Sequence, residues 1–220
     1  MSDYDKFVKL LAQTDGRDKI YKCIAGVVKV LATVDTTPAH LASYKLLGTS
    51  IGDGRSLMRM AKWAGDVPKM RSALTQCRAK GGVDLRKLVE FFRVLGNFLY
   101  VLGDNVAFLS RHRLLLAGSH KQLQWRSKVA QFWGFFFAVV LDLLALRTAL
   151  RRHRDGDAAN ARKEARAALT ALAKDAADAL VAMATVGYMR GVWQPGPATT
   201  GALTALSGAI ATQLNWAKIK

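Results

Sequence analysis

The sequence has few of the residues that build catalytic, metal or disulfide sites. Cys23 and Cys77 are its only cysteines, and they lack the paired spacing of a zinc site or a disulfide framework. The four histidines stand outside any metal-ligand spacing and beside basic residues, so we expect them on the surface. Neither a phosphate-cradling glycine loop nor a nucleophile elbow occurs. We therefore predict that the protein is not an enzyme and binds no metal and no cofactor.

Proline and acidic residues are also scarce. The chain has 4 prolines in 220 residues, and its β-branched residues rarely alternate with polar ones, which favours helices over strands. Its 33 Lys and Arg residues outnumber 16 Asp and Glu residues, which gives a net charge of +17. Such an excess attracts polyanions, either nucleic acid or anionic lipid headgroups. We predict an all-α protein of about six to eight helices.

Long apolar segments beside the basic ones favour the membrane over nucleic acid. Aromatic side chains gather in apolar runs such as Phe91-Phe92 and Phe135-Phe136-Phe137, where nucleic-acid bases would not reach them. No nucleic-acid recognition motif is present. The first residues lack the positive and apolar regions of a secretory signal, which fits a protein inserted after its synthesis in the cytosol. We predict a membrane protein that does not bind nucleic acid.

Three apolar stretches are candidates for crossing or deeply entering the bilayer. Residues 84–117 are strongly apolar but interrupted by charges, Asp104 among them. Residues 132–146 carry only Asp142 and have marginal spanning length, which equally fits a buried hairpin helix. Residues 198–217 have no charge and are the best candidate by that criterion, with small residues at helix-packing intervals. We expect Asp104 and Asp142 to face protein or water, because charge is costly at membrane depth.

Two Asp-Gly-Arg sequences are predicted to form turns between helices. The first lies within Thr14–Asp18, between a short opening helix and an amphipathic helix that runs from about residue 20. The second, residues 53–55, follows a helix that begins at Pro38 and that glycines are expected to end near Leu47. The second turn should open a new helix.

Basic and apolar residues recur at helical spacing in the segment that begins at this second turn. The basic residues are three or four positions apart, and the apolar ones fall on the opposite side of the same helix. Such a helix lies on an anionic membrane surface, where each basic side chain contributes about 1 kcal/mol. A core-facing helix with a solvated basic face has the same pattern. The residues predicted to bind the membrane are Arg55, Leu57, Arg59, Met60, Lys62, Ala64, Val67 and Lys69.

Three stretches of the chain together resemble the peroxin eleven family. Thr14–Lys19 with the following amphipathic helix is similar to the N-terminal signature of the family. Ser56–Trp63 stands where the family carries its membrane-remodelling amphipathic helix, and Leu95–Arg111 is similar to the central segment of the family. The motif residues that carry the resemblance are Asp15, Gly16, Arg17, Asp18, Lys19, Gly96, Asn97, Tyr100, Asp104, Asn105, Ser110 and Arg111.

The resemblance implies a protein of the peroxisomal membrane, or of the glycosomal membrane in trypanosomatids, that elongates and proliferates the organelle before fission. It also implies self-association to a homo-oligomer, an N-terminal part that faces the cytosol, delivery by the import receptor for peroxisomal membrane proteins, and contact with the fission machinery. Alternative functions are a pore-forming channel for small metabolites and a scaffold that recruits fission proteins.

The expected layout is a single domain over residues 1–220. Residues 1–83 would form cytosol-facing amphipathic helices, and residues 84–220 would form membrane-embedded and membrane-associated helices, of which one or two span or deeply enter the bilayer. The expected partners are an anionic phospholipid membrane, further copies of the chain, the import receptor and the fission machinery.

Overall fold

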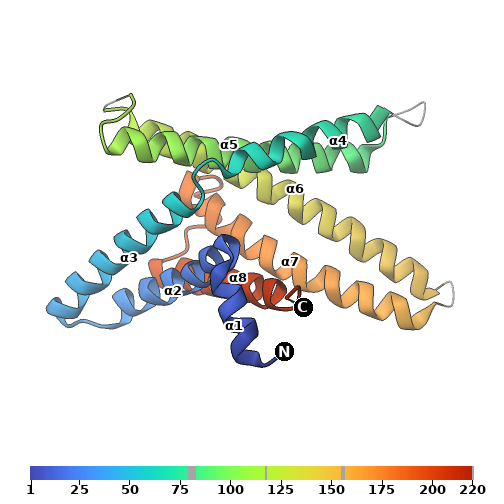
Figure 1. Ribbon diagram of the computed structural model, residues 1–220, viewed down its shortest axis with the longest axis horizontal. Helices are drawn as coiled ribbons and strands as arrows, with labels where there is room; N and C mark the ends of the chain where they lie inside the picture. The colour runs from blue at the N-terminus through green and yellow to red at the C-terminus, as the bar shows by residue number, and fades with distance from the viewer. Residues whose placement is uncertain (79–82, 117, 155–156, 220) are drawn as a thin grey trace. The chain divides into compact units, whose positions relative to one another are not determined.

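The computed structural model describes residues 1–78, 83–116, 118–154 and 157–219, and every regular element in these ranges is helical. The all-α prediction is confirmed (Figure 1). In chain order the elements are α1 Asp3–Ala12, α2 Thr14–Val34, α3 Pro38–Met58, the 3-10 helix η1 Lys62–Gly65, α4 Asp66–Arg78, α5 Leu85–Arg111, α6 His120–Arg154, α7 Ala158–Val186 and α8 Pro197–Trp216.

The helices form two compact units. The terminal unit contains Met1–Met60 and Gly187–Lys220, and the central unit contains Ala61–Val186. The predicted division after residue 83 concerns exposure to the membrane, which these units do not test, so it stays a prediction.

In the terminal unit, α2 and α8 pack with their backbones in direct contact. A Cβ atom on Gly26 of α2 would collide with the backbone nitrogen of Ala205 in α8. A Cβ atom on Gly208 would lie 2.5 Å from the backbone nitrogen of Cys23. Only glycine allows such an approach, because every other residue would place a side chain between the helices. The predicted packing role of the small residues in α8 is confirmed.

In the central unit, α6 packs between α5 and α7, and both neighbours contact it through small residues. A Cβ atom on Gly96 of α5 would lie 2.6 Å from the Cα atom of Gly134 in α6. Along α7, Ala161, Ala168 and Ala182 are buried at multiples of seven residues, the spacing that keeps one helix face on a neighbouring helix. The central unit is therefore a pair of helical hairpins that share α6 (Figure 1).

Both predicted Asp-Gly-Arg turns are wrong. α2 already begins at Thr14, so Asp15 lies in its first turn, where an acid is favourable at the positive end of the helix dipole. α3 continues to Met58 through Gly48, Gly52 and Gly54. Each interior glycine costs about 1 kcal/mol relative to alanine, an amount that the packing of α3 on α2 outweighs.

Among the described residues, α6 is the one helix that is long and apolar enough to cross a membrane. Its 35 residues span about 52 Å, which exceeds the roughly 30 Å of a hydrocarbon core. Only 11% of its apolar window is buried, whereas the core helix of a soluble protein would be mostly buried. Residues 198–217, the best candidate by charge, do not meet this criterion: α8 is uncharged, but its glycine, serine and threonine residues make it less apolar than the apolar window of α6.

Replacing Gly26 by alanine should destabilise the terminal unit by about 1–3 kcal/mol, because the new methyl group would collide with the backbone of α8. Gly52→Ala is the matched control. Nothing lies within 4 Å of the methyl group that this substitution would add to α3, so it should stabilise the helix by about 0.5–1 kcal/mol. Thermal unfolding followed by circular dichroism in detergent measures both effects. Equal melting temperatures for the two variants would contradict the close α2–α8 contact.

Candidate membrane-binding surface

The single helix predicted over residues 55–70 is wrong. α3 ends at Met58, and Ala61 takes a left-handed conformation with φ of 58°, which interrupts the helix. The chain then forms η1 and begins α4 at Asp66. Pro68 fits the first turn of α4, because backbone N–H groups have no partner within the helix there. The residues predicted to bind the membrane therefore lie on α3, on η1, on α4 and on the turn between α3 and η1, and not on one helical face.

Arg55 and Arg59 make contacts within the protein. The Arg55 Nε atom donates a hydrogen bond to Asp18 Oδ1 at 2.9 Å, and their side chains are only 17% and 4% exposed. Lys19 Nζ lies 3.2 Å from the other carboxylate oxygen of Asp18. The Arg59 Nε atom is shielded from solvent. Arg55 therefore fastens α3 to α2, so its predicted role as a lipid anchor does not fit its position.

These cations control the ionisation of Asp18. Burial by itself would raise the pKa of this carboxyl, but the charges of Arg55, Lys19 and Arg59 outweigh that cost and lower the pKa from 3.8 to about 2. Asp18 is therefore a carboxylate at any physiological pH. Its charge, buried between α2 and α3, is compensated by the hydrogen bond and the ion pairs around it.

Two motif residues of α5 hold the start of the central unit. Asn97 Nδ2 donates a hydrogen bond to Asp66 Oδ2 at 2.6 Å. The backbone N–H of Ala61 donates to Asn105 Oδ1 at 3.0 Å, at the left-handed residue itself. The Trp63 ring meets the Phe98 ring edge-on with centroids 6.0 Å apart. Segment 61–66 is thus attached to α5 along its length.

Most of the remaining motif residues also serve the fold. A Cβ atom on Gly16 would collide with the Leu10 carbonyl oxygen, so the glycine allows α1 to fold against α2. Asp104 is buried among protein atoms, as predicted. The Lys128 ammonium lies 5.1 Å from the centre of the Tyr100 ring, and the Arg111 guanidinium lies 5.5 Å from the centre of the Phe108 ring. The Ser110 hydroxyl donates a hydrogen bond to the Leu116 carbonyl oxygen at 2.7 Å. Asp15 and Arg17, by contrast, lie exposed on α2.

Six of the eight predicted membrane-binding residues are exposed, namely Leu57, Met60, Lys62, Ala64, Val67 and Lys69. Lys69 Nζ pairs with Asp66 at 2.8 Å, yet its side chain is 65% exposed and its ammonium has further donors for a lipid phosphate. Sequence reasoning missed Arg71 and Leu74, which are also exposed on α4. The seven-residue spacing from Val67 to Leu74 is the signal that could have found them.

A second exposed surface runs along α6. Large apolar side chains recur there at helical spacing, and such a long stripe is too costly to leave in water. Its members are Trp125, Trp133, Phe136, Leu143 and Leu150. Asp142, by contrast, faces Asp175 of α7, so its predicted orientation toward protein is confirmed. In the described part of the chain, no three metal-ligating side chains lie together.

The helical fold, the exposed apolar helix α6 and the motif contacts all lie within the part of the chain that matches a known family. Residues 4–216 match the family Peroxisomal biogenesis factor 11 (PEX11). The chain belongs to the PEX11 family. PEX11 membership confirms the resemblance found in the sequence and makes this chain a peroxisomal membrane protein of organelle biogenesis.

Individual PEX11 relatives are distant in sequence. The chain is 24% identical over 225 residues to "Peroxisomal membrane protein 11-4" of Oryza sativa subsp. indica, with 96% of this chain and 94% of the rice protein covered. It is 25% identical over 152 residues to "Peroxisomal membrane protein 11 homolog" of Dictyostelium discoideum, with 68% of this chain and 58% of that protein covered. No solved structure matches.

Acid should weaken the α2–α3 contact of this PEX11 protein. Because the folded-state pKa of Asp18 is depressed to about 2 from 3.8, its stabilising charge is fully present above about pH 4 and is lost as the pH falls toward 2. The shift corresponds to about 2 kcal/mol. We expect Asp18→Asn to lower the melting temperature at pH 7 and to remove part of the decline between pH 4 and pH 2.

Melting curves at several pH values, followed by circular dichroism, measure this loss. Asp3→Asn, an exposed position at the start of α1, is the control substitution. The other carboxyls titrate in all three proteins, so the difference between the curves isolates Asp18. Parallel pH profiles for the wild type and Asp18→Asn would show that the buried ion pair contributes nothing.

Proposed function

We propose that this PEX11 protein elongates and proliferates the peroxisomal membrane before fission, without catalysis, by inserting exposed segments shallowly into one leaflet. The observation that carries the proposal is segment 61–69. Its inner side is fastened to α5 by Asn97 and Asn105, while Lys62, Val67 and Lys69 are exposed to solvent. Area added to one leaflet and not to the other forces the bilayer to bend.

Charge and apolar burial would act together at this surface. Each lysine near an anionic leaflet is worth about 1 kcal/mol, and the half-exposed Val67 gains about as much when it enters the interface. The electrostatic and the apolar contributions to membrane binding are therefore of similar size. Hydrogen bonds to α5 hold the segment, so it keeps its shape as it enters the headgroup layer. It therefore does not flatten along the membrane surface.

The terminal unit supports self-association in the same proposal. An apolar stripe on α2 stays exposed although α3 and α8 cover other sides of that helix, and burying it against a second copy would remove it from water. Its members are Tyr21, Ile24, Val27, Leu31 and Val34. We extend the proposal to an N-terminal part that faces the cytosol, delivery by the import receptor, contact with the fission machinery and, in a trypanosomatid, a place in the glycosomal membrane.

The test is tubulation of anionic liposomes by the full-length protein. Lys62→Gln combined with Lys69→Gln removes two charges, which should weaken attachment of the segment by about 2 kcal/mol, or roughly 30-fold. We expect electron microscopy to show far fewer tubules. Lys45→Gln combined with Lys163→Gln changes two other exposed lysines and the same net charge, so it should tubulate like the wild type.

Val67→Ser is the complementary variant, because it keeps the charge but removes an apolar side chain from segment 61–69. It should bind the liposomes and bend them less. Wild-type tubulation by the Lys62 and Lys69 double variant would overturn insertion of this segment. Equal loss in the two double variants would reduce the effect to total charge.

A further inference from the structure

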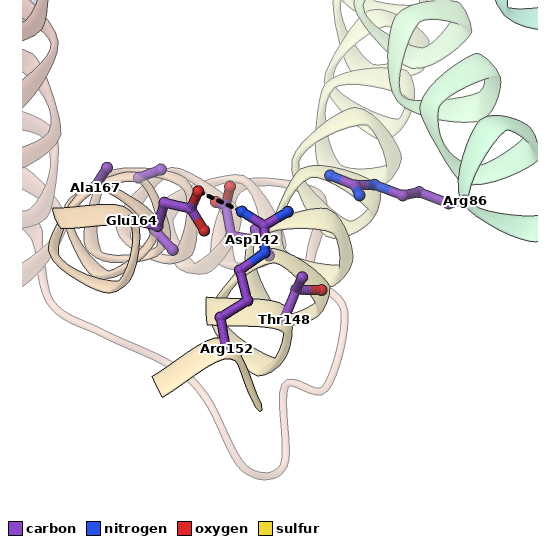
Figure 2. A pocket seen from close by; sticks show the side chains of 9 residues that line it. Arg86, Asp142, Thr148, Arg152, Glu164 and Ala167 are labelled. Atoms are coloured by element: carbon purple, nitrogen blue, oxygen red, sulfur yellow. Dashed lines mark hydrogen bonds and ion pairs between the residues drawn. The ribbon is translucent and has the colours of Figure 1, made fainter. Parts of the chain in front are cut away.

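A pocket of about 440 Å³ in the central unit is lined by residues of α5, α6 and α7. Four alanines form its apolar wall, and five polar side chains line the rest (Figure 2). The alanines are Ala145, Ala167, Ala168 and Ala171, and the polar residues are Arg86, Asp142, Thr148, Arg152 and Glu164. None of these residues belongs to the membrane-binding surface described above.

The polar groups of the pocket leave one cation and one carboxylate oxygen unmatched. Arg152 and Glu164 neutralise each other across an ion pair of 2.6 Å (Figure 2). The Arg86 side chain reaches toward α6, and its guanidinium forms no ion pair with any residue that the structure describes. Asp142 Oδ2 is shielded from solvent and has no hydrogen-bond partner within the same residues. A buried acceptor without a donor is costly, so a ligand that supplies an N–H group would be favoured.

The pocket lies where α6 changes from apolar to basic. Residues 132–146 carry only Asp142, and the last turn of the helix contains Arg151, Arg152, His153 and Arg154. Because α6 is about 20 Å longer than a hydrocarbon core, its ends project into the headgroup layers. An arginine in a pocket between helices at this depth lies in the layer that holds phospholipid phosphates.

We propose that this pocket binds the headgroup of one phosphatidylethanolamine molecule. The phosphate pairs with Arg86, the ammonium donates to Asp142 Oδ2, and the acyl chains leave along the alanine wall. Phosphatidylcholine carries the same charges but has no N–H donor for the carboxylate. Phosphatidylglycerol supplies no cation and places its negative charge near Asp142 and Glu164. Phosphatidylserine has the ammonium but adds a carboxylate that these acids repel.

The experiment is native mass spectrometry of the full-length protein, released from nanodiscs that contain equal amounts of phosphatidylethanolamine, phosphatidylcholine and phosphatidylglycerol. The wild type should retain phosphatidylethanolamine over phosphatidylcholine by roughly tenfold, the ratio that one charge-assisted hydrogen bond provides. Asp142→Asn should bring this ratio close to one, because the carboxylate is the group that distinguishes the two headgroups. Arg86→Gln removes the phosphate contact that both lipids share, so it should lower the retention of both and leave their ratio unchanged. Arg86→Lys keeps the cation and should keep the retention, which separates binding from folding.

Arg151→Gln is the matched control, because it removes an exposed arginine of α6 that does not line the pocket, and it should retain the lipid like the wild type. Equal retention of phosphatidylethanolamine and phosphatidylcholine by the wild type would overturn the proposal. A preference for phosphatidylglycerol would overturn it in favour of a simple anion site. Displacement of the lipid by millimolar free phosphoethanolamine would assign the pocket to a soluble ligand.

Discussion

Close backbone contact between helices is the constraint on which the rest of this structure depends. Gly26 and Gly208 bring α2 against α8, and Gly96 and Gly134 bring α5 against α6. At Gly26, Gly96 and Gly208 a methyl group would already collide with a neighbouring backbone. Such packing suits a membrane protein, because contacts between helices in lipid gain little from burying apolar surface and depend on fit. Large apolar side chains are consequently left for the outside, as on α6.

Buried polar contacts join further helix pairs, which do not pack through these glycines. Asp18 and Arg55 join α2 to α3, and Asn97 joins α5 to Asp66 at the start of α4. Each of these carboxylates is almost fully buried and has a partner with good geometry, which is the condition under which a buried charge is tolerated. The residues that resemble the PEX11 motifs are therefore mainly residues of the scaffold.

This division of roles places scaffold contacts and proposed membrane-binding residues side by side in segment 61–69 of this PEX11 protein. The polar contacts face inward, and the lysines and half-exposed apolar residues around the left-handed Ala61 face outward. The exposed stripe of α6 and the pocket beside Arg86 add further surfaces whose chemistry suits lipid. Each surface consists mainly of side chains that are not packed between helices.

The sequence by itself determined the helical class, the family and the long apolar segment that became α6, because charge, apolar content and ordered motifs are properties of the chain alone. Only the tertiary structure decided that the Asp-Gly-Arg sequences lie inside helices and that Arg55 binds Asp18 and not lipid. Local propensities weigh about 1 kcal/mol per residue, and contacts between residues far apart in the chain outweigh them. Whether a basic residue meets a buried carboxylate or the solvent depends on which helix packs beside it, and spacing along one helix carries no information about that neighbour.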